Sequence, residues 1–162
     1  MPPFYYRIIR ALNRYTTFTP EFQKKVSREE FIRSAEAYLG YPYILWGDGS
    51  TRESGIDCSH LIARALIDTG AMHPAFYRTA RHLRNLTTPL EPWVEILAWD
   101  LLFLWDDTGN IGHVAIILDR LWEHSVTILD ASGPSTGIWS TTIREIQLGN
   151  EKFFIGTPSF LI

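Results

Sequence analysis

The first part of the chain carries the apolar spacing of amphipathic helices. One such stretch opens with a capping box, Ser27 with Glu30 three positions later, and ends at Gly40. A second runs over residues 58–69, with its apolar positions on one face, and a short third helix is expected around residues 79–85. These stretches predict a helical first half.

The second half changes to short runs rich in β-branched and aromatic residues, separated by clusters of Gly, Asn, Asp and Ser. The runs predict strands at 101–105, 113–118, 125–130 and 153–157. Because helices come first and strands afterwards, the pattern predicts an α+β fold, with the helices packed on one antiparallel sheet.

The segment before the first capping box is apolar and aromatic. We expect residues 1–26 to form an N-terminal helical arm in front of a single domain at 27–162. Its apolar positions at 4–12 would pack on that domain or on a partner, and they suit a homodimer contact.

Composition and charge narrow the class of protein. The chain has 162 residues, 46% of them hydrophobic, which suffices for one domain whose core needs no disulfide or metal. The net charge of −3 and the lack of a basic stripe argue against a nucleic-acid partner. No apolar run approaches the roughly 20 residues that cross a bilayer. The amino terminus shows no Sec signal, so we expect a cytoplasmic protein or export by a non-Sec route.

The single cysteine, Cys58, excludes an intramolecular disulfide and a four-cysteine zinc site, and we expect no metal and no cofactor. It stands where a Gly-rich loop gives way to the second predicted helix. The N–H groups and the dipole of a helix N-terminus stabilise negative charge, and therefore a thiolate. This position favours a nucleophile, while the alternative of a small core residue stays open because unpaired Cys is often buried.

A nucleophilic thiol needs an imidazole as its base and a polar group to orient that base. Of the five histidines, His113 opens the most apolar strand, where an ionisable ring is costly without a partner. His60 lies two residues beyond Cys58, so on a helix it would point away from the thiol. Asp130 ends the next predicted strand and could meet His113 side by side. The alternative is that both residues are purely structural, with His113 a satisfied histidine at a strand end and Asp130 an aspartate in the turn that ends a strand.

Three blocks of sequence, in order, resemble the NlpC-type family of papain-like cell-wall cysteine peptidases. They are Pro-Tyr-Ile-Leu-Trp-Gly followed by Gly-Ile-Asp-Cys-Ser, then Trp-Asp-Leu-Leu-Phe followed by Gly-His-Val-Ala-Ile, and finally Ile-Leu-Asp-Ala-Ser. The resemblance covers about residues 29–137. It implies a papain-like catalytic domain that hydrolyses peptidoglycan-derived peptides near γ-D-glutamyl linkages.

The resemblance also implies roles for single residues. Cys58 would attack the amide carbonyl, His113 would move the proton and Asp130 would orient the imidazole. Tyr43 is the candidate for a hydroxyl at the oxyanion hole. The matching substrate-binding positions are Asp57 and Ser59, which would hold a substrate amine, and Trp46 and Thr79, which would line the groove.

The sequence departs from the family pattern at three points. The third catalytic position is usually His and is here Asp130, and the residue after Asp-Cys-Ser is usually Gly and is here His60. The loop before Cys58 is longer than usual, which leaves open whether Tyr43 or Trp46 fills the family's tyrosine position.

Two other functions fit the same residues. A transglutaminase-like acyl transferase also orders its catalytic residues Cys, His, Asp. A catalytically silent peptide-binding or assembly module would keep the fold and use the aromatic groove alone.

Overall fold

The structure is a computed structural model that describes residues 23–74, 79–90, 96–122, 124–134, 136–149 and 152–162. Residues 1–22, most of the predicted arm, lie outside the described residues, so the arm and its homodimer contact remain predictions.

The helices lie close to where the sequence predicts them. The described residues contain α2 (Arg28–Glu36), α3 (Cys58–Asp68) and α4 (Ala80–Arg84). The Ser27 hydroxyl accepts a hydrogen bond from the Glu30 backbone N–H at 3.1 Å, so Ser27 caps α2 as its sequence position predicts. In the described part of the chain, no helix is both long enough and apolar enough to cross a membrane.

The strands form one antiparallel sheet in the order β1-β6-β2-β3-β4-β5. Their bounds are β1 Thr87–Pro89, β2 Leu101–Trp105, β3 Ile111–Arg120, β4 Ser125–Ser132, β5 Ser140–Gln147 and β6 Phe153–Pro158. The four predicted strands are all present, and β3 and β4 extend beyond their predicted ends. The sequence pattern did not predict β1 or β5, although β5 pairs with β4 along its full length.

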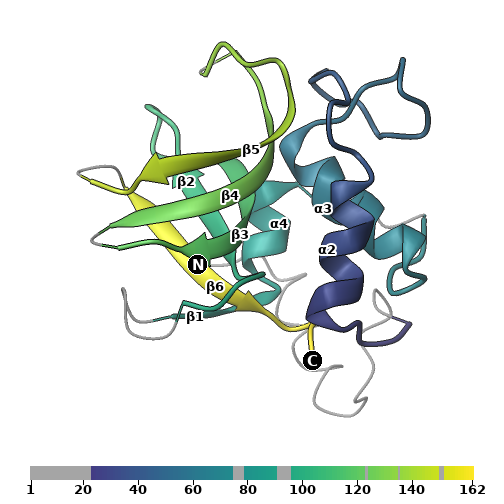
Figure 1. The fold of residues 1–162 in the computed structure, drawn as a ribbon, viewed down its shortest axis with the longest axis horizontal. Coiled ribbons are helices and arrows are strands. Elements are labelled where there is room, and N and C mark those ends of the chain that lie inside the picture. The colour runs from purple at the N-terminus through teal and green to yellow at the C-terminus, as the bar shows by residue number, and fades with distance from the viewer. Residues whose placement is uncertain (1–22, 75–78, 91–95, 123, 135, 150–151) are drawn as a thin grey trace, which may run out of the picture.

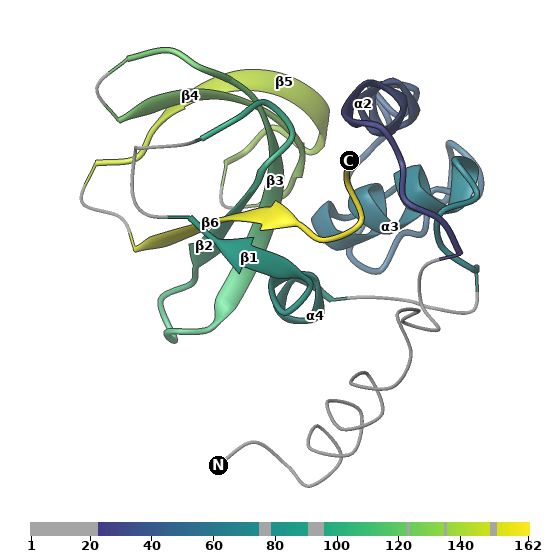
Figure 2. The ribbon, with the colours of Figure 1, turned by 90° about the horizontal axis from the view of Figure 1, so that it is seen from below.

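The helices and the sheet form two layers. Figures 1 and 2 show α2 and α3 on one side of the sheet, with α4 beside the strands. The core between the layers contains fully buried side chains from both, including Phe31, Ile62, Phe103, Ile116 and Leu129. Alternate positions of the same strands form a second apolar cluster, including Leu102, Ala115, Ile117, Val126 and Ile128. The predicted fold class, α+β with helices packed on one antiparallel sheet, is confirmed.

One buried carboxylate ties three parts of the fold together. Asp100, which is fully buried, accepts hydrogen bonds from the Thr157 hydroxyl at 2.9 Å and from the Leu97 backbone N–H at 2.8 Å. The Arg28 guanidinium lies 3.6 Å from the same carboxylate. These contacts join the start of α2 to β2 and β6, so Asp100 stabilises the packing of the helix against the sheet.

Candidate active site

A tightly folded loop sets the position of Cys58. The Asp57 backbone N–H donates to the Gly47 carbonyl at 3.1 Å, and Ile56 forms bridges with Tyr43 and Asp48. A Cβ at Gly47 would lie 2.7 Å from backbone atoms of Gly55, so only glycine permits this approach. The loop therefore closes against the start of α3, and Cys58 becomes the first residue of that helix, as predicted.

Asp57 fixes the loop to the helix. Its Oδ1 accepts from the His60 backbone N–H at 2.8 Å and from the Ser59 hydroxyl at 3.0 Å. Its Oδ2 accepts from the Trp46 backbone N–H at 3.1 Å and lies 2.9 Å from His60 Nδ1. Burial raises the pKa of Asp57, but the hydrogen bonds from His60 and Ser59 outweigh burial and lower that pKa. Asp57 is thus an ionised N-cap, and its contact with the His60 ring was not predicted from the sequence.

His113 and Asp130 meet across neighbouring strands. His113 is on β3 and Asp130 is on β4, and His113 Nε2 lies 2.8 Å from Asp130 Oδ2. The His113 side chain is 22% exposed, whereas the Asp130 side chain is fully buried. A partly exposed imidazole held by a buried carboxylate has the geometry of an oriented base.

The same imidazole also contacts the thiol. Burial by itself would lower the pKa of His113, but hydrogen bonds with Asp130 and with Cys58 overcome it and raise that pKa to about 10. Because Nε2 faces Asp130, Nδ1 is the ring nitrogen left for the thiol. Cys58, His113 and Asp130 therefore lie together, although they are far apart in the sequence.

Two further residues complete the surroundings of Asp130. The Arg144 guanidinium donates from Nη2 to Oδ2 at 2.8 Å and from Nε to Oδ1 at 3.3 Å. The Ser132 hydroxyl donates to Oδ1 at 2.9 Å. Burial raises the pKa of Asp130, but the bonds from His113 and Arg144 outweigh it and lower that pKa. No role was predicted for Arg144, because β5, on which it lies, was not predicted.

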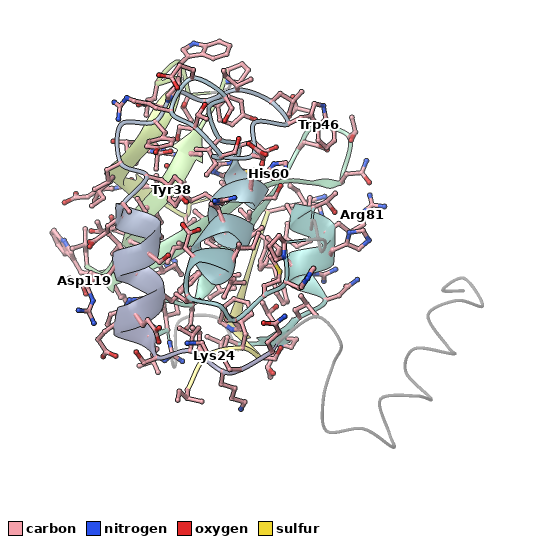
Figure 3. The ribbon with its side chains drawn as sticks, turned by 90° about the vertical axis from the view of Figure 1, so that its right-hand side faces the viewer. Lys24, Tyr38, Trp46, His60, Arg81 and Asp119 are labelled. Carbon is pink, nitrogen blue, oxygen red and sulfur yellow. The ribbon has the colours of Figure 1, made fainter. Side chains whose placement is uncertain are left out.

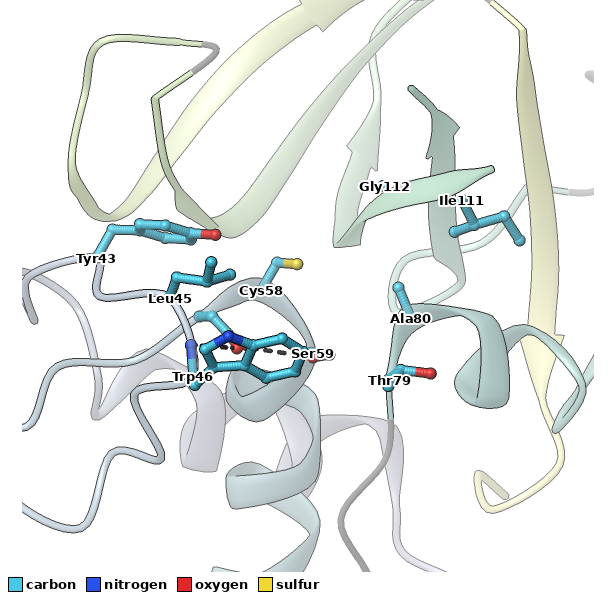
Figure 4. A pocket seen from close by; sticks show the side chains of 10 residues that line it. Tyr43, Leu45, Trp46, Cys58, Ser59, Thr79, Ala80, Ile111 and Gly112 are labelled. Atoms are coloured by element: carbon cyan, nitrogen blue, oxygen red, sulfur yellow. Dashed lines mark hydrogen bonds between the residues drawn. The ribbon is translucent and has the colours of Figure 1, made fainter. Parts of the chain in front are cut away.

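A pocket of about 150 Å³ opens beside the thiol. In Figure 4, Tyr43, Leu45 and Trp46 stand on one side of Cys58, and Thr79, Ala80 and Ile111 stand on the other. All the predicted substrate-binding residues, Asp57, Ser59, Trp46 and Thr79, line this pocket. The wall also contains Leu45, Ala80, Ile111 and Gly112, which were not predicted.

Tyr43 and Trp46 occupy different places on the same wall. The Tyr43 ring lies edge-on to the Trp139 ring, with centroids 6.4 Å apart, and packs so closely on Gly133 that a Cβ there would be 2.6 Å from it. Its hydroxyl end points towards the Cys58 side of the pocket in Figure 4. Trp46 is 65% exposed and has a φ of 68°. It lies towards the same end of the molecule as His60, which is in the first turn of α3 (Figure 3). Of these two residues Tyr43 carries a hydroxyl and Trp46 does not, which supports Tyr43 over Trp46 as the oxyanion candidate.

No protein-family model and no curated protein matches the sequence. Solved structures do match. A lipoprotein-like NLP/P60 family protein from Staphylococcus aureus matches 86% of this chain with a TM-score of 0.57 at 21% identity, over 45% of its own length. An NlpC/P60 family protein from Bacillus cereus matches 83% of this chain at 18% identity and a TM-score of 0.57, over 41% of its own length. The NlpC/p60 domain of the peptidoglycan hydrolase SagA matches 82% of this chain, with a TM-score of 0.54 at 23% identity, over its whole length.

The chain has the NlpC/P60 fold. The resemblance predicted from three sequence blocks is therefore confirmed at the level of the fold, and with it the papain-like class. The chain spans less than half the length of the Staphylococcus and Bacillus proteins and the full length of the SagA domain.

Proposed function

We propose that this NlpC/P60-fold protein is a cysteine peptidase that hydrolyses amide bonds of peptidoglycan stem peptides, of the γ-D-glutamyl type, through an acyl-enzyme. The observation that carries the proposal is that the His113 imidazole makes one hydrogen bond with Cys58 and another with Asp130. The fold shared with NlpC/P60 proteins, one of them described as a peptidoglycan hydrolase, supports the choice of substrate.

The first half of the reaction transfers the acyl group to sulfur. The Cys58 thiolate attacks the amide carbonyl while His113 carries the proton. The Cys58 backbone N–H, which has no acceptor within the helix because it opens α3, donates to the developing oxyanion together with the Tyr43 hydroxyl. Each such donor contributes about 3–4 kcal/mol to transition-state stabilisation. His113 then gives its proton to the leaving amine, and a thioester remains on Cys58.

The second half returns the enzyme to its starting state. His113 takes a proton from water, the resulting hydroxide attacks the thioester, and the acid product leaves as the thiolate and the imidazolium form again. Asp130 keeps the ring in place throughout and stabilises its charged form.

The pocket favours a particular substrate chemistry. Asp57 brings a negative charge and Ser59 a hydroxyl to the pocket beside the thiol, which favours a peptide with an unblocked amine. The apolar walls, Trp46 and Leu45 opposite Thr79 and Ala80, would hold the peptide between them.

The direct test is mass spectrometry of muropeptides incubated with the wild type and with Cys58→Ala. The wild type should release cleaved stem peptides whose masses identify the bond, and Cys58→Ala should release none while keeping its far-UV circular dichroism. Full activity in Cys58→Ala would overturn the proposal.

A transglutaminase-like acyl transfer is the second candidate, because the residue that orients His113 is a carboxylate, Asp130. The same thioester would then react with an amine instead of water. Adding an amine acceptor to the muropeptide reaction separates the two functions: the peptidase gives hydrolysed product, and the transferase gives crosslinked product.

A further inference from the structure

Arg144 reaches Asp130 from the opposite side to His113. The strands are ordered β3-β4-β5, so the carboxylate on β4 lies between an imidazole on β3 and a guanidinium on β5. In the pairing of β4 with β5, Arg144 lies opposite Ile128, two positions from Asp130. A long side chain spans such a diagonal separation easily. Arg144 is therefore placed by the β4–β5 register.

The contact is a two-point one. Arg144 donates from Nη2 to Oδ2 at 2.8 Å and from Nε to Oδ1 at 3.3 Å, while His113 donates to the same Oδ2 at 2.8 Å. A planar guanidinium that bonds both oxygens fixes the plane of a carboxylate, which a single donor cannot do. Arg144 thus fixes the orientation in which the Asp130 carboxylate presents Oδ2 to His113. The hydrogen bond from the Ser132 hydroxyl to Oδ1 restrains the carboxylate further.

The charges around this carboxylate are shared. Asp130 is fully buried, and the charged or titratable groups that act on it are His113 from β3 and Arg144 from β5, with Cys58 of α3 beyond the imidazole. If a single cation faced this buried carboxylate, that cation would balance its whole negative charge. With two cations, part of the charge of Asp130 is balanced by Arg144.

We propose that Arg144 is a positioning residue of this site, which holds the Asp130 carboxylate against His113 and shares its charge with the imidazole. The consequence for catalysis rests on the proposed function, whereas the consequence for thiol reactivity does not need the substrate. Arg144 is absent from the pocket lining, so it acts through Asp130.

The test separates charge from geometry. Arg144→Gln removes both the charge and the two-point contact, and Arg144→Lys keeps the charge but loses the planar fork. Glu145→Gln is the matched control, because it changes one exposed charge at the next position of β5. The rate of Cys58 alkylation by iodoacetamide is measured against pH for each protein, and muropeptide hydrolysis is measured beside it.

Loss of a cation near the thiolate–imidazolium pair should make the thiolate harder to form. The alkylation midpoint of Arg144→Gln should therefore rise by about one pH unit, the size expected for a charge several ångströms away in a partly buried site. Arg144→Lys should keep nearly the wild-type midpoint but lose about tenfold in kcat with little change in KM. Glu145→Gln should match the wild type in both.

An unchanged midpoint in folded Arg144→Gln would overturn the proposal and leave a purely structural ion pair. If Arg144→Gln does not fold, Arg144→Lys decides the outcome, because a wild-type kcat there would show that the fork positions nothing. A shifted midpoint in a protein that cleaves no muropeptide would sink the proposed function and keep the role of Arg144. Absence of any Cys58 alkylation in the wild type would contradict both.

Discussion

The His113 imidazole lies 2.8 Å from the Asp130 carboxylate, and the two residues come from adjacent strands that are joined by a short connection. The Asp130 side chain is fully buried, while the His113 side chain is partly exposed. The buried carboxylate therefore stabilises the proton on Nε2 of the ring. The other ring nitrogen, Nδ1, which is left for Cys58, can exchange a proton with a substrate.

Substitutions of this pair should have graded effects on hydrolysis. His113→Ala should abolish it, because the imidazole that hydrogen-bonds with the thiol is removed. Asp130→Ala should lower kcat by about 10²–10⁴-fold, because the ring loses its orientation. Asp130→Asn is the matched variant, since it keeps the shape and removes the charge. The measurement is kcat on muropeptides, with thermal unfolding to show that each variant folds. Equal rates for wild type and Asp130→Ala would contradict the role of Asp130.

Gly133→Ala should impair the site although it replaces none of the proposed catalytic residues. The new methyl group would lie 2.6 Å from the Tyr43 ring, so the ring must move and its hydroxyl must leave the oxyanion position. We expect a loss of about 10²-fold in kcat, similar to the loss in Tyr43→Phe. Gly149→Ala is the control, because its added Cβ meets nothing within 4 Å. If Gly133→Ala and Gly149→Ala are equally active, Tyr43 has no part in the oxyanion hole.

Asp100→Ala should change stability and leave the chemistry alone. It removes a buried acceptor for Thr157 and Leu97 and leaves Arg28 without its carboxylate. The free energy of unfolding in urea should fall by about 2–4 kcal/mol. Asp107→Ala, which removes an exposed carboxylate, should have almost no effect. Cys58 alkylation of the folded Asp100→Ala protein should match the wild type, and a slower rate would place Asp100 in the site.

The stability of the fold should depend on pH through His113 and Asp130. The pKa of His113 is raised from 6.5 to about 10, so its protonated form stabilises the fold fully below pH 6.5, and this stabilisation is lost as the pH rises through about 10. The pKa of Asp130 is lowered from 3.8, so its contribution is present above pH 3.8 and is lost as the pH falls through the folded-state value. Urea unfolding should therefore show stability falling between pH 6.5 and 10, by at most about 1.4 kcal/mol per unit from this group. His113→Ala should flatten this slope, and an unchanged slope would contradict the assignment.

Much of this arrangement could be predicted from the sequence, because it depends on local signals. The capping residue Ser27 and the apolar spacing predicted the helices, and β2 has the predicted bounds, 101–105. Cys58 and His113 stood out because a reactive thiol belongs at a helix N-terminus and an imidazole is costly on an apolar strand. These signals require only a few neighbouring residues.

The missed features depend on contacts between distant segments. The sequence of β5, Ser-Thr-Thr-Ile-Arg-Glu-Ile-Gln, is mostly polar because β5 is an edge strand in which only Thr141 is buried. Its alternation is too weak to predict a strand, so Arg144 could not be placed beside Asp130. The closeness of Gly133 to Tyr43 was missed for the same reason: it joins the end of β4 to a loop 90 residues earlier.

If the proposed function is right, the Cys58 thiol, the His113 imidazole and the Asp130 carboxylate act as one coupled unit. NMR titration of the His113 ring, in the wild type and in Cys58→Ala, tests it most directly. We expect the His113 ring to have a pKa of about 10 in the wild type and a lower pKa in Cys58→Ala, because the thiol contributes one of the hydrogen bonds that raise it. A wild-type His113 that titrates near 6.5, with no change on removal of the thiol, would contradict it.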